Sequence, residues 1–311
     1  MGVSEDFSRL SSMLPDFELE LYLEAVQQPL PECVRINTLK FDGREVERFL
    51  IQRGWRLEPL AWARHGYRVL EAPAKDLGNT MEHLLGLIYI QGPVSMLPVE
   101  TLEPGRGERC LDLCAAPGSK STQIAQLIGL QGVIVANDAS KKRIRALSFN
   151  LQRWGAVNSV VTLTDGRLFH RWGAGLFDRV LLDVPCSALG IVSKDWGALR
   201  RYRSRHSEKL QRLQLSLLES GYRCLRPGGL LVYSTCTIHP LENEAVISQF
   251  LEKHPESTLE PVEHEGLKGR RPIEEFSGER FSPEVAKCFK CYPQDNMAEG
   301  FFVARIRSPA A

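Results

Sequence analysis

Residues 181–190 read LLDVPCSALG, and this stretch decides the fold class. An apolar run ends in an acid, a proline and a cysteine, which is typical of a buried parallel strand with functional groups at its carboxyl end. A second run, residues 230–237, reads LLVYSTCT and also ends at a cysteine. Either Cys186 or Cys236 alone is more often a small core residue. Two such strand ends together favour thiol chemistry at one edge of a sheet.

From residue 109 onward, short apolar runs alternate with amphipathic segments. Strands are predicted at 109–113, 132–138, 159–163, 178–183 and 229–233, and helices near 119–130, 140–154, 207–225 and 241–253. This alternation predicts an α/β fold with a doubly wound, mostly parallel sheet. Residues 300–306, GFFVARI, predict a final antiparallel strand at or near an edge. Residues 258–297 carry prolines and glycines and give no clear pattern of elements.

The first part of the chain predicts a smaller α+β region, residues 1–104, that includes linker helices. The expected elements are helices at 16–28, 43–52 and 79–87, and strands at 34–39, 55–60 and 67–70. The turn cluster Pro104-Gly105-Arg106-Gly107 predicts a joint with a second domain, residues 105–311. Arginines are frequent in the first region, and they indicate either nucleic-acid contacts or an ordinary solvated face.

Composition excludes several classes of protein. A net charge of +1 gives the whole protein no strong electrostatic attraction to nucleic acid, so binding of RNA would need a local basic patch. The irregular spacing of eight cysteines argues against a disulfide scaffold. The acidic start of the chain lacks the apolar core of a secretory signal. No apolar run reaches the roughly 20 residues of a membrane span. We therefore expect a cytoplasmic protein with no membrane partner.

A candidate nucleoside site follows the first strand of the second domain. Residues 111–121, LDLCAAPGSKS, read as a strand, a turn of small residues and a helix start, which lets a ligand approach the backbone and the helix amides. The glycine spacings of dinucleotide binders and P-loops are absent, which favours a nucleoside over a pyrophosphate. Asp138 and Asp165 end the next two strands, where acids can accept from ribose hydroxyls and an exocyclic amine. Each acid alone is equally typical of a turn or a helix N-cap.

Three motifs together resemble the RNA cytosine-5 methyltransferases of the Nop/Sun family. They are DLCAAPGSKS at 112–121, DVPCSALG at 183–190, and YSTCT at 233–237 followed by ENE at 242–244. The resemblance extends from the 34–39 strand to residues 300–305 and is nearest to the bacterial branch that acts on 16S rRNA. It implies a Rossmann-like class I methyltransferase with an N-terminal RNA-binding region, with tRNA as the alternative target. It also implies a site for S-adenosylmethionine formed by Cys114, Ala115, Ala116, Pro117, Gly118, Ser119, Lys120, Asp138, Asp165 and Asp183.

The chemistry of that family explains why two cysteines are needed. Carbon 5 of cytosine is a weak nucleophile, and a thiolate that adds at carbon 6 activates it. The resemblance implies that Cys236 is this nucleophile and that Cys186 assists product release. DNA cytosine methyltransferases use a Pro-Cys cysteine instead, so the reverse assignment remains open. Asp183 is expected to contact ring nitrogen 3 and the exocyclic amine of the target cytosine.

Basic residues after the Pro-Cys motif are the candidates for RNA binding. Residues 200–206 read RRYRSRH, and with Lys194 and Trp196 they combine charge for phosphates with aromatic faces for a base. The candidate RNA-binding residues are Lys194, Arg200, Arg201 and Arg203. A second cluster, Lys141, Lys142, Arg143 and Arg145, is more typical of a solvated helix surface. We expect RNA as the partner of a monomeric enzyme.

No metal is expected. Cys288 and Cys291 form a lone CxxC pair with only His264 as a nearby helper, whereas a structural zinc site needs four ligands. Two other enzyme and binding classes fit less well. A nicotinamide dehydrogenase would need a glycine fingerprint, and a non-catalytic RNA-binding module would leave the cofactor loop and both thiols without a role.

The sequence departs from the family pattern at two places. Ala188 stands where the family usually has glycine, and residues 193–196, SKDW, replace a basic stretch that contains proline. The first change narrows the loop by one methyl group, and the second bears on which RNA is the target. The chain ends soon after the FFVA strand, so we expect no C-terminal RNA-binding module.

Overall fold

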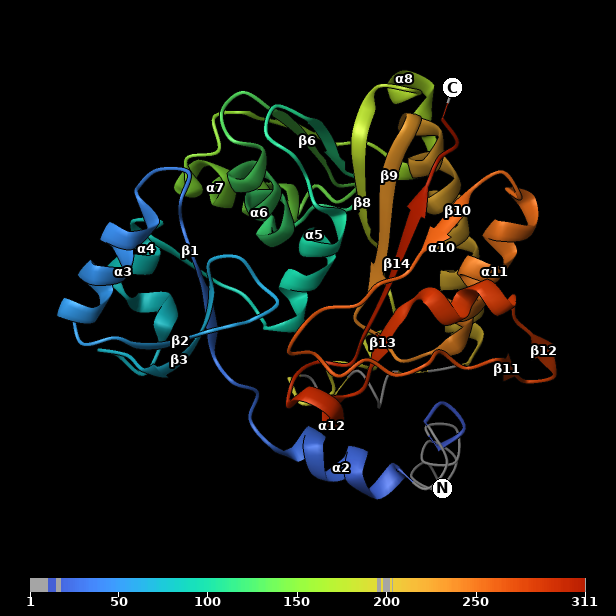
Figure 1. Cartoon of the computed structure of the whole chain (residues 1–311), viewed down its shortest axis with the longest axis horizontal. Coiled ribbons are helices and arrows are strands. Elements are labelled where there is room, and N and C mark those ends of the chain that lie inside the picture. Colours follow the sequence, from blue (N-terminus) through green and yellow to red (C-terminus); the bar gives the residue numbers. More distant parts are fainter. Residues whose placement is uncertain (1–10, 15–17, 195–196, 198–201, 203, 311) are drawn as a thin grey trace.

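Two sheets organise the chain, a small one near the N-terminus and a large one that carries the strand-end motifs (Figure 1). The computed structural model describes residues 11–14, 18–194, 197, 202 and 204–310. In that part of the chain, the large sheet runs in the order β10-β14-β9-β8-β5-β6-β7, with β13 beside β14. Its strands are β5 Arg109–Asp112, β6 Val133–Asn137, β7 Ser159–Thr162, β8 Phe177–Asp183, β9 Leu225–Thr235, β10 Thr258–Glu260, β13 Phe289–Cys291 and β14 Phe301–Arg307.

The large sheet confirms the predicted α/β fold. Strands β7, β6, β5, β8 and β9 are mutually parallel, and β14 joins β9 antiparallel. The final strand therefore lies one place from the edge, as its sequence predicted. Parallel neighbours bring all their carboxyl ends to one edge of the sheet. The motifs that end β5, β6, β8 and β9 consequently face one another across a short distance.

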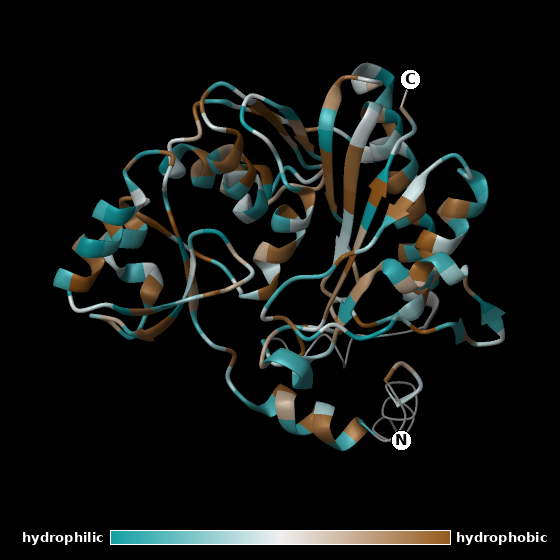
Figure 2. Cartoon of the chain, viewed as in Figure 1, coloured by the Kyte–Doolittle hydropathy of each residue, from teal (hydrophilic) through white to brown (hydrophobic). Residues whose placement is uncertain are grey.

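Helices cover both faces of this sheet. Helices α5 Leu97–Leu102, α6 Ser119–Ile128 and α7 Ile144–Trp154 bury their apolar sides on one face, and α10 Ser204–Cys224 and α11 Glu244–Lys253 cover the other. Side chains alternate accordingly along β8, where Val180 and Leu182 join the core of one layer and Leu181 joins the other. Figure 2 shows apolar residues concentrated in these strands. Short helices connect the layers: η2 Val94–Met96, η3 Gly166–Leu168, α8 His170–Gly173 and η4 Pro240–Glu242.

The small sheet has the order β2-β3-β1-β4 and is antiparallel. It consists of β1 Cys33–Ile36, β2 Arg56–Pro59, β3 Gly66–Glu71 and β4 Ile88–Ile90, and α3 Gly43–Gln52 packs Val46 and Leu50 against it. Helix α2, Leu19–Gln27, lies apart from the sheet and packs beside α12. The helix predicted over 79–87 forms only in part, as α4 Met81–Leu84, which follows η1 Leu77–Asn79. Gly86 then turns the chain at a φ of 71° into β4.

Residues 258–297 form short elements that the sequence did not reveal. They are β10, the hairpin of β11 Glu275–Phe276 and β12 Glu279–Arg280, η5 Pro283–Lys287, β13, and α12 Pro293–Asn296. Strands of two or three residues carry too little periodicity to be recognised. A buried ion pair anchors the segment, because the Lys290 ammonium lies 2.6 Å from the Glu244 carboxylate of α11 and both side chains are fully buried.

The turn at 104–107 follows α5, and α5 packs in the core of the large sheet through Leu97, Val99 and Leu102. A boundary at residue 104 would separate this helix from the sheet that it covers. We therefore propose that the boundary between the two units lies before α5, in the segment after β4.

Arg35 of β1 joins the two units. Its side chain is fully buried, and its guanidinium lies 4.5 Å from the centre of the Trp154 ring. It donates hydrogen bonds to Gln91 Oε1 at 3.2 Å, Gln126 Oε1 at 2.6 Å, the Ser119 carbonyl at 3.1 Å and Thr122 Oγ1 at 2.7 Å. Burial lowers the pKa of Arg35 to about 9, so the guanidinium stays charged at neutral pH. One cation of the N-terminal unit thereby holds the first turns of α6.

Replacement of Arg35 by Met should lower the free energy of unfolding by about 3 kcal/mol, because four buried acceptors lose their donor. Urea denaturation followed by circular dichroism measures this loss. Arg44→Met is the matched control, since Arg44 is exposed on α3, and its change should stay within about 0.5 kcal/mol. Equal losses in the two variants would contradict the role of Arg35 as the joint.

Candidate active site

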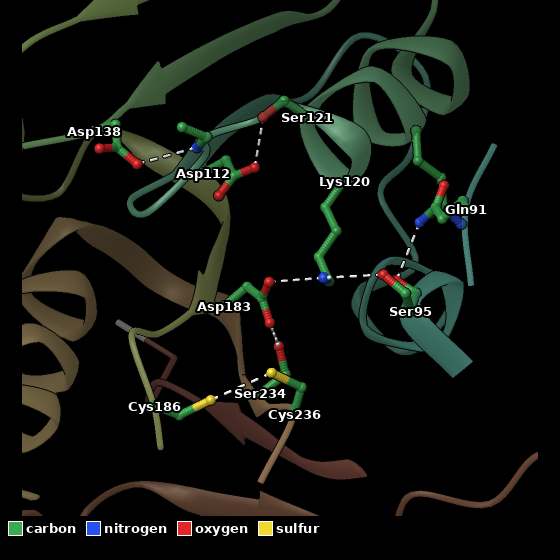
Figure 3. A network of polar contacts seen from close by, with 12 residues as sticks. Gln91, Ser95, Asp112, Lys120, Ser121, Asp138, Asp183, Cys186, Ser234 and Cys236 are labelled. Atoms are coloured by element: carbon green, nitrogen blue, oxygen red, sulfur yellow. Dashed lines mark hydrogen bonds and ion pairs between the residues drawn. The ribbon is translucent and has the colours of Figure 1, made fainter. Parts of the chain in front are cut away.

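The ends of four strands place acids and thiols along one edge of the large sheet (Figure 3). Asp112 ends β5, Asp138 follows β6 directly, and Asp183 ends β8. The register of the parallel pair β8–β9 sets Asp183 beside Ser234. Cys186 and Cys236 follow these two partners by three and two residues, so the register itself brings the two thiols together.

The turn between β5 and α6 leaves its backbone close to neighbouring residues. Gly118 has a φ of 107°, which favours glycine, and a Cβ there would lie 3.0 Å from Leu147 Cδ1. The Ala116 N–H donates to Asp138 Oδ2 at 3.2 Å, and the Ser140 N–H donates to Asp138 Oδ1 at 2.8 Å. Asp138 is thus fixed at the rim of the turn. Burial raises the pKa of Cys114 in this turn, which keeps it a thiol.

Asp112 is a site residue that the sequence analysis missed. Its carboxyl is buried, and Oδ2 accepts a hydrogen bond of 2.6 Å from Ser121 Oγ. The other oxygen, Oδ1, is buried and has no hydrogen-bond partner among the described residues. Burial raises the pKa of Asp112 to about 7. Its position at the end of β5, next to the loop motif, was the only sequence signal, and a buried acid with a free oxygen indicates a missing donor.

Lys120 connects the turn to Asp183 at the end of β8. Its Nζ lies 2.7 Å from Asp183 Oδ2 and 3.3 Å from Ser95 Oγ. Ser234 Oγ donates to Asp183 Oδ1 at 3.0 Å, so both carboxylate oxygens are held (Figure 3). Burial acts to lower the pKa of Lys120, but the Asp183 carboxylate outweighs it and the pKa is raised. Ser95 and Ser234 had no role in the sequence analysis, and only the folded chain brings them to Lys120 and Asp183.

The two strand-end thiols touch. Cys186 Sγ and Cys236 Sγ are 3.3 Å apart, and both side chains are only partly buried. Their hydrogen bond is the main cause that raises the pKa of Cys186 well above its ordinary value, and burial adds to it. Ser187 Oγ also lies 2.8 Å from Thr237 Oγ1, which joins the residues that follow the two cysteines. The sulfurs can therefore act on one reacting atom from the same side.

Some predicted residues have other partners. Asp165 caps η3 through the Arg167 N–H and pairs with the Arg167 guanidinium at 2.6 Å. The Lys194 ammonium lies 2.6 Å from Glu299 and is half exposed. Arg200, Arg201 and Arg203, as well as Trp196, lie outside the described residues. The RNA contacts predicted for these residues therefore remain predictions.

The CxxC pair is in the core. Cys288 and Cys291 are both buried, and His264 Nε2 lies 3.0 Å from Thr101 Oγ1. Across residues 11–14, 18–194, 197, 202 and 204–310, no cluster of three or more His, Cys, Asp or Glu side chains could hold a metal ion. Within the same residues, every helix is too short or too polar to cross a bilayer.

Comparison with known proteins assigns the family. A family model described as 16S rRNA methyltransferase RsmB/F matches residues 99–307, and a model of the N-terminal domain of 16S rRNA methyltransferase RsmF matches residues 4–93. The chain belongs to the RsmB/F methyltransferase family. This membership confirms the resemblance drawn from the sequence and the expected enzyme class, an RNA methyltransferase.

Named relatives of this methyltransferase include enzymes for two kinds of RNA. The tRNA (cytosine(49)-C(5))-methyltransferase of Pyrococcus abyssi is 38% identical over 99% of this chain and 100% of its own length. The ribosomal RNA small subunit methyltransferase F of Erwinia tasmaniensis is 38% identical over 97% of this chain, which spans 63% of that relative. A crystal structure of a methyltransferase homologue from Pyrococcus horikoshii, 34% identical, matches 99% of this chain and 96% of its own with a TM-score of 0.86.

Ala188, where the methyltransferase departs from the family glycine, is in a left-handed conformation with a φ of 59°. This region of backbone space disfavours residues with a Cβ. The loop holds the position because the Gly190 N–H donates to the Cys236 carbonyl at 2.9 Å and the Ile191 N–H to the Ala188 carbonyl at 3.2 Å. A backbone hydrogen bond from Ala188 also lowers the pKa of Cys186, against the larger effects that raise it. The strained residue thus lies two positions after Cys186, in the same loop.

Ala188→Gly should raise the free energy of unfolding by about 1 kcal/mol, because glycine relieves the left-handed strain at a smaller cost in chain entropy. Urea denaturation measures the change. Ala146→Gly, at an exposed position in the first turn of α7, is the matched control and should lower stability by up to about 1 kcal/mol. A loss of stability in both variants would contradict the strain at Ala188.

Proposed function

We propose that this methyltransferase transfers a methyl group from S-adenosylmethionine to carbon 5 of a cytidine in RNA, with Cys236 as the nucleophile. One observation carries the proposal: two thiols 3.3 Å apart lie at the ends of adjacent strands, next to the Asp183 carboxylate. A single active cysteine would not need a second sulfur in contact with it. The pair suits a reaction in which one thiol forms a covalent bond and a partner assists its release.

The residues at the sheet edge fit S-adenosylmethionine. The cofactor supplies a methyl group on a positively charged sulfur. Asp112 Oδ1, buried and unpartnered, can accept from its ammonium group, and Asp138 at the rim of the 113–118 turn can receive ribose hydroxyls. The turn residues Cys114 to Lys120 would lie against the ligand, and Asp165 would receive the adenine amine after leaving Arg167. The donor set thus matches a cationic nucleoside.

The cytosine chemistry follows from the thiol pair. The Cys236 thiolate would add to carbon 6, and the electrons of the ring double bond would then attack the methyl group through carbon 5, while the pair of the broken methyl–sulfur bond stays on the cofactor sulfur. A base would next remove the carbon 5 proton, the ring double bond would reform, and the bond between carbon 6 and sulfur would break with its electron pair returning to Cys236. Asp183 would accept from the exocyclic amine and, when it carries a proton, donate to ring nitrogen 3, with Lys120 and Ser234 fixing its two oxygens. Cys186 would assist the last step from its place beside Cys236.

Two kinds of RNA are proposed as the target. The first candidate is 16S rRNA, from the family models, and the second is tRNA, which is favoured by an equal 38% identity to the named tRNA enzyme. Lys194 and the basic run with Arg200, Arg201 and Arg203 are the proposed RNA contacts. We also propose that the enzyme acts as a cytoplasmic monomer.

Bisulfite sequencing of total RNA from cells with and without the gene identifies the modified cytidine. A change in neither RNA would contradict both targets.

Substitution of the two cysteines should give opposite phenotypes. Cys236→Ala should abolish methyl transfer because no nucleophile remains. Cys186→Ala should accumulate a covalent protein–RNA adduct because release is impaired. Methyl transfer from radiolabelled cofactor and denaturing gel electrophoresis measure the two effects. Cys33→Ala, a buried cysteine of β1, is the control and should do neither. An adduct in the Cys236 variant would reverse the roles.

Binding of S-adenosylmethionine should strengthen as the pH rises from 6 to 8. The raised pKa of Asp112, about 7, leaves it mostly protonated at pH 6 and mostly ionised at pH 8. If only the carboxylate binds the ammonium group, affinity rises roughly tenfold across this interval. Calorimetry measures the dissociation constant. The Asp112→Asn variant is the control for the ligand's own ionisation and should lack this increase. A matching rise in that variant would contradict the role of Asp112.

A further inference from the structure

A buried glutamate holds the loop that carries Cys186. Glu242 ends η4, and its side chain is fully buried. Its Oε2 accepts from the Ser187 N–H at 2.8 Å and from Gln214 Nε2 at 3.1 Å, and its Oε1 accepts from Ser207 Oγ at 2.8 Å. Gln214 Nε2 also donates to the Pro185 carbonyl at 2.9 Å. The Cys186 loop is therefore fastened on both sides of the cysteine.

The donors around Glu242 suit a carboxylate. Oε2 faces an amide N–H and an amide NH₂, which are donors only, so this oxygen carries no proton. Among the described residues, no lysine, arginine or histidine forms an ion pair with Glu242. Burial of a carboxyl group is costly unless hydrogen bonds compensate it, and the three donors here do so.

The charge acts on Cys186. Glu242 is among the groups that raise the pKa of this cysteine, after the hydrogen bond with Cys236, burial, and the charge of Cys236. Glu242 and the contact with Cys236 thus both raise the pKa of Cys186. The buried Lys120 ammonium pairs with the Asp183 carboxylate. Cys236 is among the groups that raise the pKa of Lys120. The two thiols therefore lie in opposite electrostatic surroundings, with an anion behind Cys186 and a cation near Cys236.

We propose that Glu242 is a positioning residue that fixes the Cys186 loop and keeps Cys186 in its thiol form, so that Cys186 donates a hydrogen bond to the sulfur of Cys236. This inference rests on the proposed function for its catalytic meaning. An S–H donor stabilises the Cys236 thiolate before attack and again when that sulfur leaves carbon 6. The difference between the electrostatic surroundings of Cys186 and Cys236 explains how two neighbouring thiols take different roles.

The test measures the reactivity of each thiol in the folded full-length chain without RNA. Wild type and Glu242→Gln are treated with iodoacetamide between pH 6 and 10, and mass spectrometry gives the alkylation rate of each cysteine peptide. The amide keeps an acceptor for the Ser187 N–H but removes the charge. We expect the rate at Cys186 to rise at least threefold at pH 8. The rate at Cys236 should change by less than twofold.

Glu244→Gln is the matched control, because Glu244 is equally buried two residues later but pairs with Lys290 instead of the thiol loop. It should lower stability without raising the alkylation rate of Cys186. A purely structural Glu242 would give equal alkylation profiles in both variants, and this result would overturn the proposal.

A second readout links the effect to the reaction. Glu242→Gln should accumulate the covalent protein–RNA adduct, with affinity for S-adenosylmethionine within twofold of wild type. Absence of adduct with an active wild type would also overturn the proposal. If wild type itself neither binds the cofactor nor methylates RNA, the proposed function fails, while a Glu242-dependent split in thiol reactivity would still support the positioning role.

Discussion

The ion pair between Lys120 and Asp183, 2.7 Å long, connects every part of the site. Lys120 belongs to the helix that follows the cofactor turn, and Asp183 ends the strand that leads to Cys186. Ser95 from the N-terminal side of α5 and Ser234 from β9 hold the two ends of the pair. Because the Lys120 ammonium is buried, its loss would leave the Asp183 carboxylate without its counter-charge. The pair thus keeps the 113–118 turn, Asp183 and the two thiol strands in one arrangement.

The parallel register of β8 and β9 determines where the thiols lie. Asp183 and Ser234 are partners in the ladder, so the residues just beyond them must lie near each other. The sulfur contact of 3.3 Å follows from this register together with the loop fastened by Ser187. Arg35 extends the same organisation outward, since it ties the N-terminal unit to the helix that carries Lys120. The expected RNA-binding unit and the methyl-transfer site are therefore one packed body.

The sequence predicted the parts of the site that depend on strand ends. Asp183, Cys186 and Cys236 follow apolar runs, and the alternation of runs and helices implies that parallel strands bring them together. It could not predict Glu242, Ser95 or Arg35, because their roles come from contacts between residues 25 or more positions apart. The sequence shows Asp112 only as an acid at the end of a strand. The burial of its carboxyl group, which marks it as a site residue, appears only in the structure. The helix predicted over 79–87 ends early because Gly86 turns the chain, although the apolar spacing around it is helical.

The account depends most on Cys236 as the attacking sulfur. RNA that carries 5-fluorocytidine at the modified position tests this directly, because carbon 5 then has no proton to lose and the adduct cannot resolve. Incubation of wild-type enzyme with S-adenosylmethionine and this RNA, followed by nuclease and protease digestion, allows mass spectrometry to locate the attached nucleotide. We expect a methylated fluoropyrimidine on Cys236. Attachment at Cys186 would contradict Cys236 as the nucleophile.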